Sequence, residues 1–181
     1  MPDKISRRVA LCGLLSALML VIMLFFSAIP LSTYAAPALA GTLSIPIVWE
    51  LGRKPGFLVY LTVSILSLFL APDKEPALLF LFLLGWYPVA RSQLQHLPRK
   101  PVRILVKLAI FNLATCLAYA LMLFVLTMPD LRAESAQWTM PLMVGILLLG
   151  NAAFLLYDVM LARMADIYVY RIRCKLFPPR I

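Results

Sequence analysis

The stretch VALCGLLSALMLVIMLFFSAI, residues 9–29, decides the fold class of this chain, and none of its residues is charged. At about 1.5 Å per residue, a helix of this length reaches ~30 Å, the thickness of the hydrocarbon core of a bilayer. Lys4, Arg7 and Arg8 stand directly before it, as is typical of the cytoplasmic end of a membrane span. We therefore predict the first transmembrane helix here.

The composition places the rest of the chain in the membrane as well. Hydrophobic residues make up 63% of the 181 residues and charged residues only 14%, whereas about a quarter of average usage is charged. The net charge of +9 does not indicate a nucleic-acid partner, because the basic residues lie at the ends of apolar runs. A cleaved export signal is disfavoured, since its apolar region covers about 7–15 residues and here further apolar runs follow.

Six apolar runs, separated by short segments rich in proline, glycine or charge, divide the chain. They predict an all-α membrane protein in which residues 1–181 form one integral-membrane domain, a compact bundle of six transmembrane helices. The approximate spans are residues 9–29, 35–51, 57–71, 77–90, 104–128 and 138–164.

The third and fourth runs are short for this interpretation. Each reaches only ~22 Å as a straight helix, so a re-entrant hairpin is an alternative. The turn between them carries Asp73, Lys74 and Glu75, and each charge left at mid-membrane would cost ~2.5–3.5 kcal/mol or more. We therefore expect the hairpin to cross fully and to reach water on the far side.

The positive charges predict the orientation of the bundle. Fifteen of the seventeen lysines and arginines lie in the N-terminus, residues 50–55, residues 91–107 and the segment from residue 163 onward. The intervening turns hold only Lys74 and Arg132, beside four acidic residues. This alternation predicts a multi-pass protein of the plasma membrane with both termini in the cytoplasm.

Polar residues in the later helices have two possible roles. Asn112 and Asn151 are expected near the midplane, where they either pair with each other or present hydrogen-bonding groups to a solute. Lys107 and Asp158 are expected at comparable depth on the cytoplasmic side, as a structural ion pair or, alternatively, as part of a proton or ion relay. The candidate substrate-binding residues are Tyr34, Asn112, Thr115, Tyr119, Trp138 and Asn151.

Signatures of catalysis and of metal binding are missing from the sequence. The chain has no H-E-x-x-H, P-loop or G-x-S-x-G motif. Its three cysteines, Cys12, Cys116 and Cys174, are scattered without metal-ligand spacing, and His96 is its only histidine. We expect no enzyme activity, no metal and no cofactor, so any ATPase that drives transport would be a separate chain.

Gly13, Ser16 and Ala17 place small side chains on one face of the first helix. Such a face allows another helix to approach closely, either inside the same bundle or on a separate membrane subunit. The surrounding segment RRVALCGLLSAL, residues 7–18, resembles the first helix of the substrate-binding S-components of energy-coupling-factor transporters. There an A-x-x-x-A pattern contacts the transmembrane coupling subunit, and here Gly13 takes the place of the first alanine and Ala17 of the second.

The resemblance implies a small-molecule solute, a vitamin or other micronutrient, bound near the outer side of six helices. It also implies a transmembrane coupling subunit and cytoplasmic ATPases as partners. Two other classes remain open. The size and six-helix plan also resemble the cell-shape protein MreD, a non-transporting scaffold of a bacterial envelope assembly. A membrane enzyme acting on lipid is the least supported, because candidate acids and bases are few.

Overall fold

The computed structural model describes residues 4–27, 33–95, 99–125 and 139–172, and every regular element in these ranges is a helix. Four stretches are long and apolar enough to cross a membrane: Arg8–Phe26, Arg53–Leu70, Pro101–Leu123 and Met140–Arg171. The prediction of an all-α protein is therefore confirmed, and these helices indicate a membrane location.

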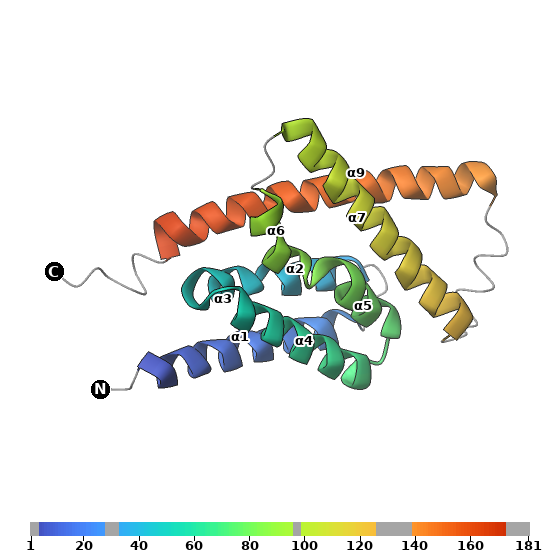
Figure 1. Cartoon of the computed structure of the whole chain (residues 1–181). Helices are drawn as coiled ribbons and strands as arrows, with labels where there is room; N and C mark the ends of the chain where they lie inside the picture. Colours follow the sequence, from blue (N-terminus) through green and yellow to red (C-terminus); the bar gives the residue numbers. More distant parts are fainter. Residues whose placement is uncertain (1–3, 28–32, 96–98, 126–138, 173–181) are drawn as a thin grey trace.

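The four long helices lie on two sides of the molecule (Figure 1). Helices α1 (Lys4–Ser27) and α4 (Arg53–Leu70) pack on one side. Helices α7 (Lys100–Ala120) and α9 (Met140–Ile167) cross each other on the other side, and each continues into a short π-helix, η3 (Leu121–Val125) and η4 (Tyr168–Ile172). The start of α1 and the end of η4 lie at the same end of the molecule (Figure 1).

The space between the two sides is filled by two broken helices. The second apolar run forms α2 (Ala35–Thr42) and α3 (Ser44–Leu51). The fourth forms α5 (Lys74–Leu79), the π-helix η2 (Phe80–Leu84) and α6 (Tyr87–Leu94). We predicted runs 35–51 and 77–90 as single spans, and the structure instead divides each of them into shorter helices.

Proline chemistry explains the break in the second run. Pro46 has no N–H for the carbonyl of Thr42, and its ring would clash with that carbonyl, so the helix is interrupted between them. Two hydroxyl groups donate to carbonyl oxygens next to the break: Thr42 Oγ1 to Leu39 at 2.6 Å and Ser44 Oγ to Gly41 at 2.7 Å. Each hydroxyl group thus finds a backbone acceptor three residues earlier, next to the interruption.

Three backbone carbonyl groups at the break in the fourth run accept hydrogen bonds from side chains in three different parts of the chain. Tyr60 Oη of α4 donates to the carbonyl of Leu81 at 2.6 Å, and Trp86 Nε1 donates to that of Phe82 at 2.7 Å. Tyr157 Oη of α9 donates to the carbonyl of Leu84 at 3.1 Å, which Pro88 cannot serve because it lacks an N–H. The irregular backbone is therefore stabilised from both sides of the molecule.

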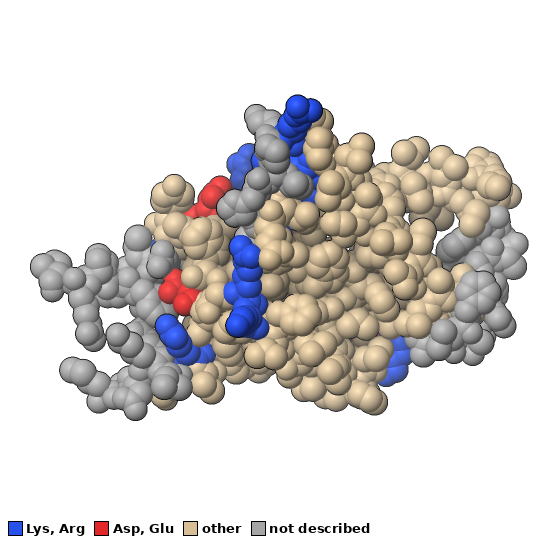
Figure 2. Space-filling view, viewed as in Figure 1, with Lys and Arg blue, Asp and Glu red and all other residues tan. Residues whose placement is uncertain are grey.

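Much of the outer surface is apolar, as expected of a surface that faces lipid. The side chains of Leu14, Phe25, Phe69 and Leu105 are all at least 70% exposed. Residues 140–149 of α9 are exposed at every position, and therefore on every face of the helix. In the view of Figure 2, lysines and arginines gather in a band on one part of the molecule, and most of the remaining surface is uncharged.

Gly41 is required by the close approach of the two broken helices and α9. A Cβ at this position would lie 2.5 Å from Tyr157 Oη and 2.6 Å from the carbonyl oxygen of Leu84. We expect Gly41→Ala to lower the free energy of unfolding by about 1–3 kcal/mol, because the backbone oxygen cannot move aside without disturbing η2. Thermal or denaturant unfolding of the detergent-solubilised protein measures this change.

Gly145→Ala in α9 is the matched control, since nothing lies within 4 Å of the added Cβ. This variant should be as stable as the wild type or slightly more stable. Equal stability of the two variants would contradict the close packing at Gly41.

Candidate functional site

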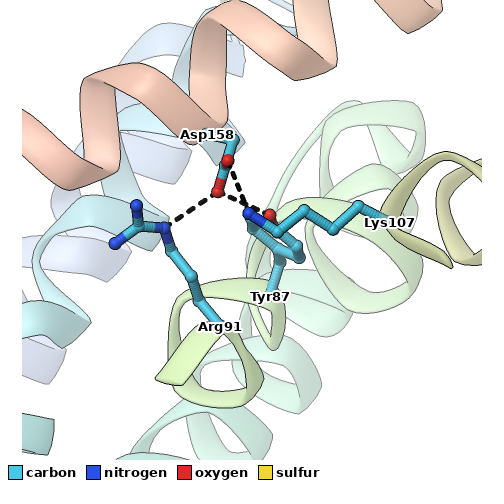
Figure 3. A network of polar contacts seen from close by, with 4 residues as sticks. All are labelled: Tyr87, Arg91, Lys107 and Asp158. Atoms are coloured by element: carbon cyan, nitrogen blue, oxygen red, sulfur yellow. Dashed lines mark hydrogen bonds and ion pairs between the residues drawn. The ribbon is translucent and has the colours of Figure 1, made fainter. Parts of the chain in front are cut away.

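A cluster of four polar side chains joins three helices around Asp158 (Figure 3). Asp158 comes from α9, Lys107 from α7, and Tyr87 and Arg91 from α6. Tyr87 and Arg91 are four residues apart on one helix, so both point to the same neighbour. The cluster therefore fixes α6, α7 and α9 relative to one another.

The Asp158 carboxylate accepts three short hydrogen bonds. Oδ1 accepts from Tyr87 Oη at 2.6 Å and from Arg91 Nε at 2.8 Å, and Oδ2 accepts from Lys107 Nζ at 2.6 Å. The side chains are poorly accessible, with 5% of Lys107, 13% of Arg91 and 17% of Asp158 exposed. The structure thus brings together the Lys107–Asp158 pair that the sequence suggested.

Tyr87 and Arg91 were not among the residues that we selected from the sequence. Tyr87 lies near the end of the fourth run, where aromatic residues are common in membrane spans, and Arg91 begins the basic connection after that run. The available signal was their spacing of four residues, which places a phenol and a guanidinium on one helix face. Their acceptor, Asp158, lies 67 residues after Arg91 along the chain, and the spacing of residues within one helix cannot reveal so distant a partner.

The cluster carries one negative and two positive charges. Arg91 has a further partner when the Gln95 amide is oriented with its oxygen toward the guanidinium, because that oxygen then accepts from Nη2 at 3.0 Å and from Nη1 at 3.1 Å. Two cations and a phenol donate to this carboxylate, and neither oxygen of Asp158 is left without a donor. The arrangement suits a fixed electrostatic junction between helices.

A cleft of about 540 Å³ lies next to this junction, between α3, α6 and α9. Arg91 lines it together with Trp49, Arg53, Gln95 and Asp166. The Asp158 cluster therefore borders a partly open space rather than the closed centre of the bundle.

The two central asparagines bond to each other. Asn112 Nδ2 donates to Asn151 Oδ1 at 3.0 Å, and Asn151 Nδ2 donates to Asn112 Oδ1 at 3.2 Å. Each amide also donates to the carbonyl four residues earlier in its own helix, Leu108 or Leu147, at 2.8 Å. Of the two roles that the sequence left open, the structure places these amides in the mutual pair.

The other candidate substrate-binding residues that the structure describes are Thr115, Tyr34 and Tyr119. Thr115 Oγ1 donates within α7 to the carbonyl of Phe111 at 2.8 Å. Tyr34 and Tyr119 place their hydroxyl oxygens 3.1 Å apart, and Tyr34 is 59% exposed. Trp138 lies outside the described residues. The described candidates therefore form an amide pair, a tyrosine pair and a threonine that bonds within its own helix.

The small-residue face of α1 points away from the bundle. Gly13 and Ala17 are exposed and Ser16 is partly exposed. A Cβ on Gly13 would meet nothing within 4 Å, and Ser16 Oγ donates to the Gly13 carbonyl at 3.0 Å. Among the described residues, nothing packs closely on Gly13, and Ala17 is exposed on the same face.

Within the described ranges, no group of three or more His, Cys, Asp or Glu residues could hold a metal ion. The chain was also compared with known proteins. No protein-family model, no curated protein and no solved structure matches it.

Asp158→Asn tests the electrostatic junction. It leaves Arg91 and Lys107 poorly exposed without a counter-charge, so we expect a loss of about 3–5 kcal/mol in the free energy of unfolding. Unfolding in detergent measures this loss. Asp166→Asn is the matched control, because Asp166 is exposed on the same helix, and its effect should stay within about 0.5 kcal/mol. Similar effects of the two variants would refute a special role for Asp158.

Proposed function

We propose that this chain is the membrane-embedded, solute-binding subunit of an energy-coupling-factor type importer, with ATP hydrolysis on separate chains. The observation that carries the proposal is the exposed Gly13–Ala17 face on α1. In the transporters that residues 7–18 resemble, the corresponding face contacts the coupling subunit. A small-residue face turned outward is available for such a contact, whereas one used for packing inside the bundle is not.

The two broken helices also support a transport function. Discontinuous transmembrane helices are common in transporters, where they form substrate sites. Their irregular backbone is tolerated only where it is buried in protein or lines a cavity. Here α2–α3 and α5–η2–α6 lie against each other between the two pairs of long helices. This interior position matches the place where transporters use such helices.

A solute would bind, in our proposal, at the end of the molecule remote from the start of α1. The hydroxyl groups of Tyr34 and Tyr119 meet there, next to the beginning of α2 and the end of α7. A pair of phenols offers both donors and acceptors with large apolar rings, a combination suited to small aromatic or polar solutes. Asn112 and Asn151, which we selected from the sequence as substrate-binding candidates, would instead support the tyrosine site structurally through their mutual hydrogen bonds.

We further propose six crossings with both termini in the cytoplasm. Supporting this layout, the start of α1 and the end of η4 lie at one end of the molecule (Figure 1). In Figure 2 most of the visible lysines and arginines lie toward that same end. Both features agree with the excess of positive charge that marks cytoplasmic borders.

A non-transporting scaffold, similar in plan to MreD, is the second candidate. It is favoured by the internal satisfaction of the deep polar groups, since Asn112 bonds to Asn151 and Asp158 bonds to Lys107, Arg91 and Tyr87. Groups that are already paired are costly to release to a solute. The exposed face of α1 would then bind a structural partner.

Gly13→Leu tests the docking face. The added side chain projects from an exposed surface, so the isolated protein should remain folded while association with a partner falls at least tenfold. The measurement is quantitative mass spectrometry of proteins that co-purify with the tagged chain. Gly145→Leu, at a glycine of α9 with equally open space, is the matched control and should retain the partners. Equal recovery with both variants would contradict docking through α1.

Solute binding is tested by thermal stability in detergent. A vitamin or precursor present at 100 times its Kd should add about 2.7 kcal/mol of stability. Tyr34→Phe combined with Tyr119→Phe should reduce this gain, because both hydroxyl groups are removed from the proposed site. No stabilisation by any vitamin or precursor, together with recovery of cell-wall synthesis proteins but no ATPase, would favour the scaffold instead.

A further inference from the structure

A second groove, of about 600 Å³, runs between α4 and α6 on the other side of α6 from the cleft that Arg91 lines. Arg53 and Lys54 stand at the start of α4, and Phe57 and Leu58 follow one turn later. Residues four apart share a helix face, so each cation lies next to an apolar side chain deeper along the groove. The groove is therefore basic at one end and apolar along its length.

The wall formed by α6 is likewise polar at one end and apolar at the other. Gln93 near the end of α6 lines the groove, and Trp86, seven residues earlier, lines it directly before α6. Val89 lies between them, and Gly56 of α4 lies close to it, because a Cβ on Gly56 would be 3.6 Å from a Val89 methyl group. The two helices thus close the floor of the groove and leave its outer side open.

The charge of this groove is one-sided. Arg53 and Lys54 give it two positive charges, and none of the described residues that line it is acidic. Both cations are exposed, as are Phe57 and Leu58. In the cleft on the other side of α6, by contrast, Asp166 lies among the lining residues. Arg53 lines both spaces and Arg91 lines the cleft, but of these two spaces the groove between α4 and α6 is the one without a lining carboxylate to oppose an anion.

We propose that this groove binds an anionic phospholipid, with its phosphate between Arg53 and Lys54 and one acyl chain along Phe57 and Leu58. Basic pockets at the cytoplasmic ends of membrane helices recognise anionic head groups in this way. The rest of α4 is long and apolar enough to span a membrane, so the groove runs from the polar border into the hydrocarbon. A free phosphate ion would use the cations but would leave the apolar wall empty. This proposal depends on membrane embedding and is independent of solute transport.

The test uses the full-length, delipidated protein in a neutral detergent, titrated with dioleoylphosphatidylglycerol and observed by native mass spectrometry. Juxtamembrane basic residues contribute about fivefold each to the binding of anionic lipid. We expect Arg53→Gln with Lys54→Gln to weaken binding roughly 25-fold, toward the level of dioleoylphosphatidylcholine. Arg8→Gln with Arg171→Gln removes two exposed positive charges elsewhere and should leave the affinity within about twofold.

A second pair of variants keeps both cations in place. Gln93→Glu adds a negative charge inside the groove, and Gln95→Glu adds the same charge two residues later, in the cleft on the other side of α6. We expect Gln93→Glu to weaken binding of phosphatidylglycerol about fivefold or more and Gln95→Glu to have little effect. Both glutamines are exposed, and unfolding temperatures in detergent verify that the variants fold.

Three results would overturn the proposal. The first is equal affinity of the wild type for phosphatidylglycerol and phosphatidylcholine. The second is unchanged phosphatidylglycerol affinity in both the Arg53–Lys54 double variant and Gln93→Glu. The third is displacement of the lipid by inorganic phosphate or glycerol 3-phosphate at comparable concentration, which would identify a site for a soluble anion.

Discussion

Tyr60, Trp86 and Tyr157 donate hydrogen bonds to the carbonyl oxygens of Leu81, Phe82 and Leu84, where the fourth apolar run departs from the α-helix. In an apolar environment no water is present to replace such donors, and each open carbonyl would cost several kcal/mol. The helices around this segment are therefore arranged so that their donors reach it. Because Tyr60 and Tyr157 come from opposite sides of the molecule, the break also ties α4 to α9 through the centre.

The Asp158 cluster extends the same principle from backbone to charge. Tyr87 begins α6, just after the irregular segment, and donates to the carboxylate that Arg91 and Lys107 also hold. The beginning of α6 is thus fixed by its backbone on one side and by a side-chain network on the other. These two neighbouring sets of bonds link α6 to α7 and α9 and help to position the three helices.

Hydropathy and proline content account for what the sequence could predict. Residues 9–29 are uncharged over the length of a span, so the first helix was predictable from length alone, and the structure forms α1 over Lys4–Ser27. Pro46 and Pro88 are visible in the sequence as helix breakers, but Tyr157, which donates to the Leu84 carbonyl that Pro88 cannot serve, lies 73 residues away on α9. Hydropathy does not report such distant partners, and we therefore predicted each run as one span.

Some residues of the candidate site could also be selected from the sequence, and others could not. Lys107 and Asp158 could be selected because charges within apolar runs are conspicuous, and Asn112 and Asn151 because amides are. Tyr87 and Arg91 could not, since a tyrosine near a span end and an arginine in a basic loop are ordinary there. Only the three-dimensional structure shows that Tyr87 and Arg91 both point to Asp158. The orientation of Gly13 was likewise open, because a stripe of small residues fits an internal and an external contact equally well.

The exposed first part of α9 has a consequence for how the sequence can vary. Residues 140–149 are exposed at every position, with exposed fractions of 45–79% for the large apolar residues, so the surrounding medium constrains them more than the shape of a neighbour does. Any apolar residue of good helical propensity satisfies that requirement. From Asn151 onward the same helix carries the amide pair, Tyr157 and Asp158, where shape and polarity both matter. Amino-acid substitutions should therefore accumulate faster in the first ten residues of α9 than in the rest of the helix.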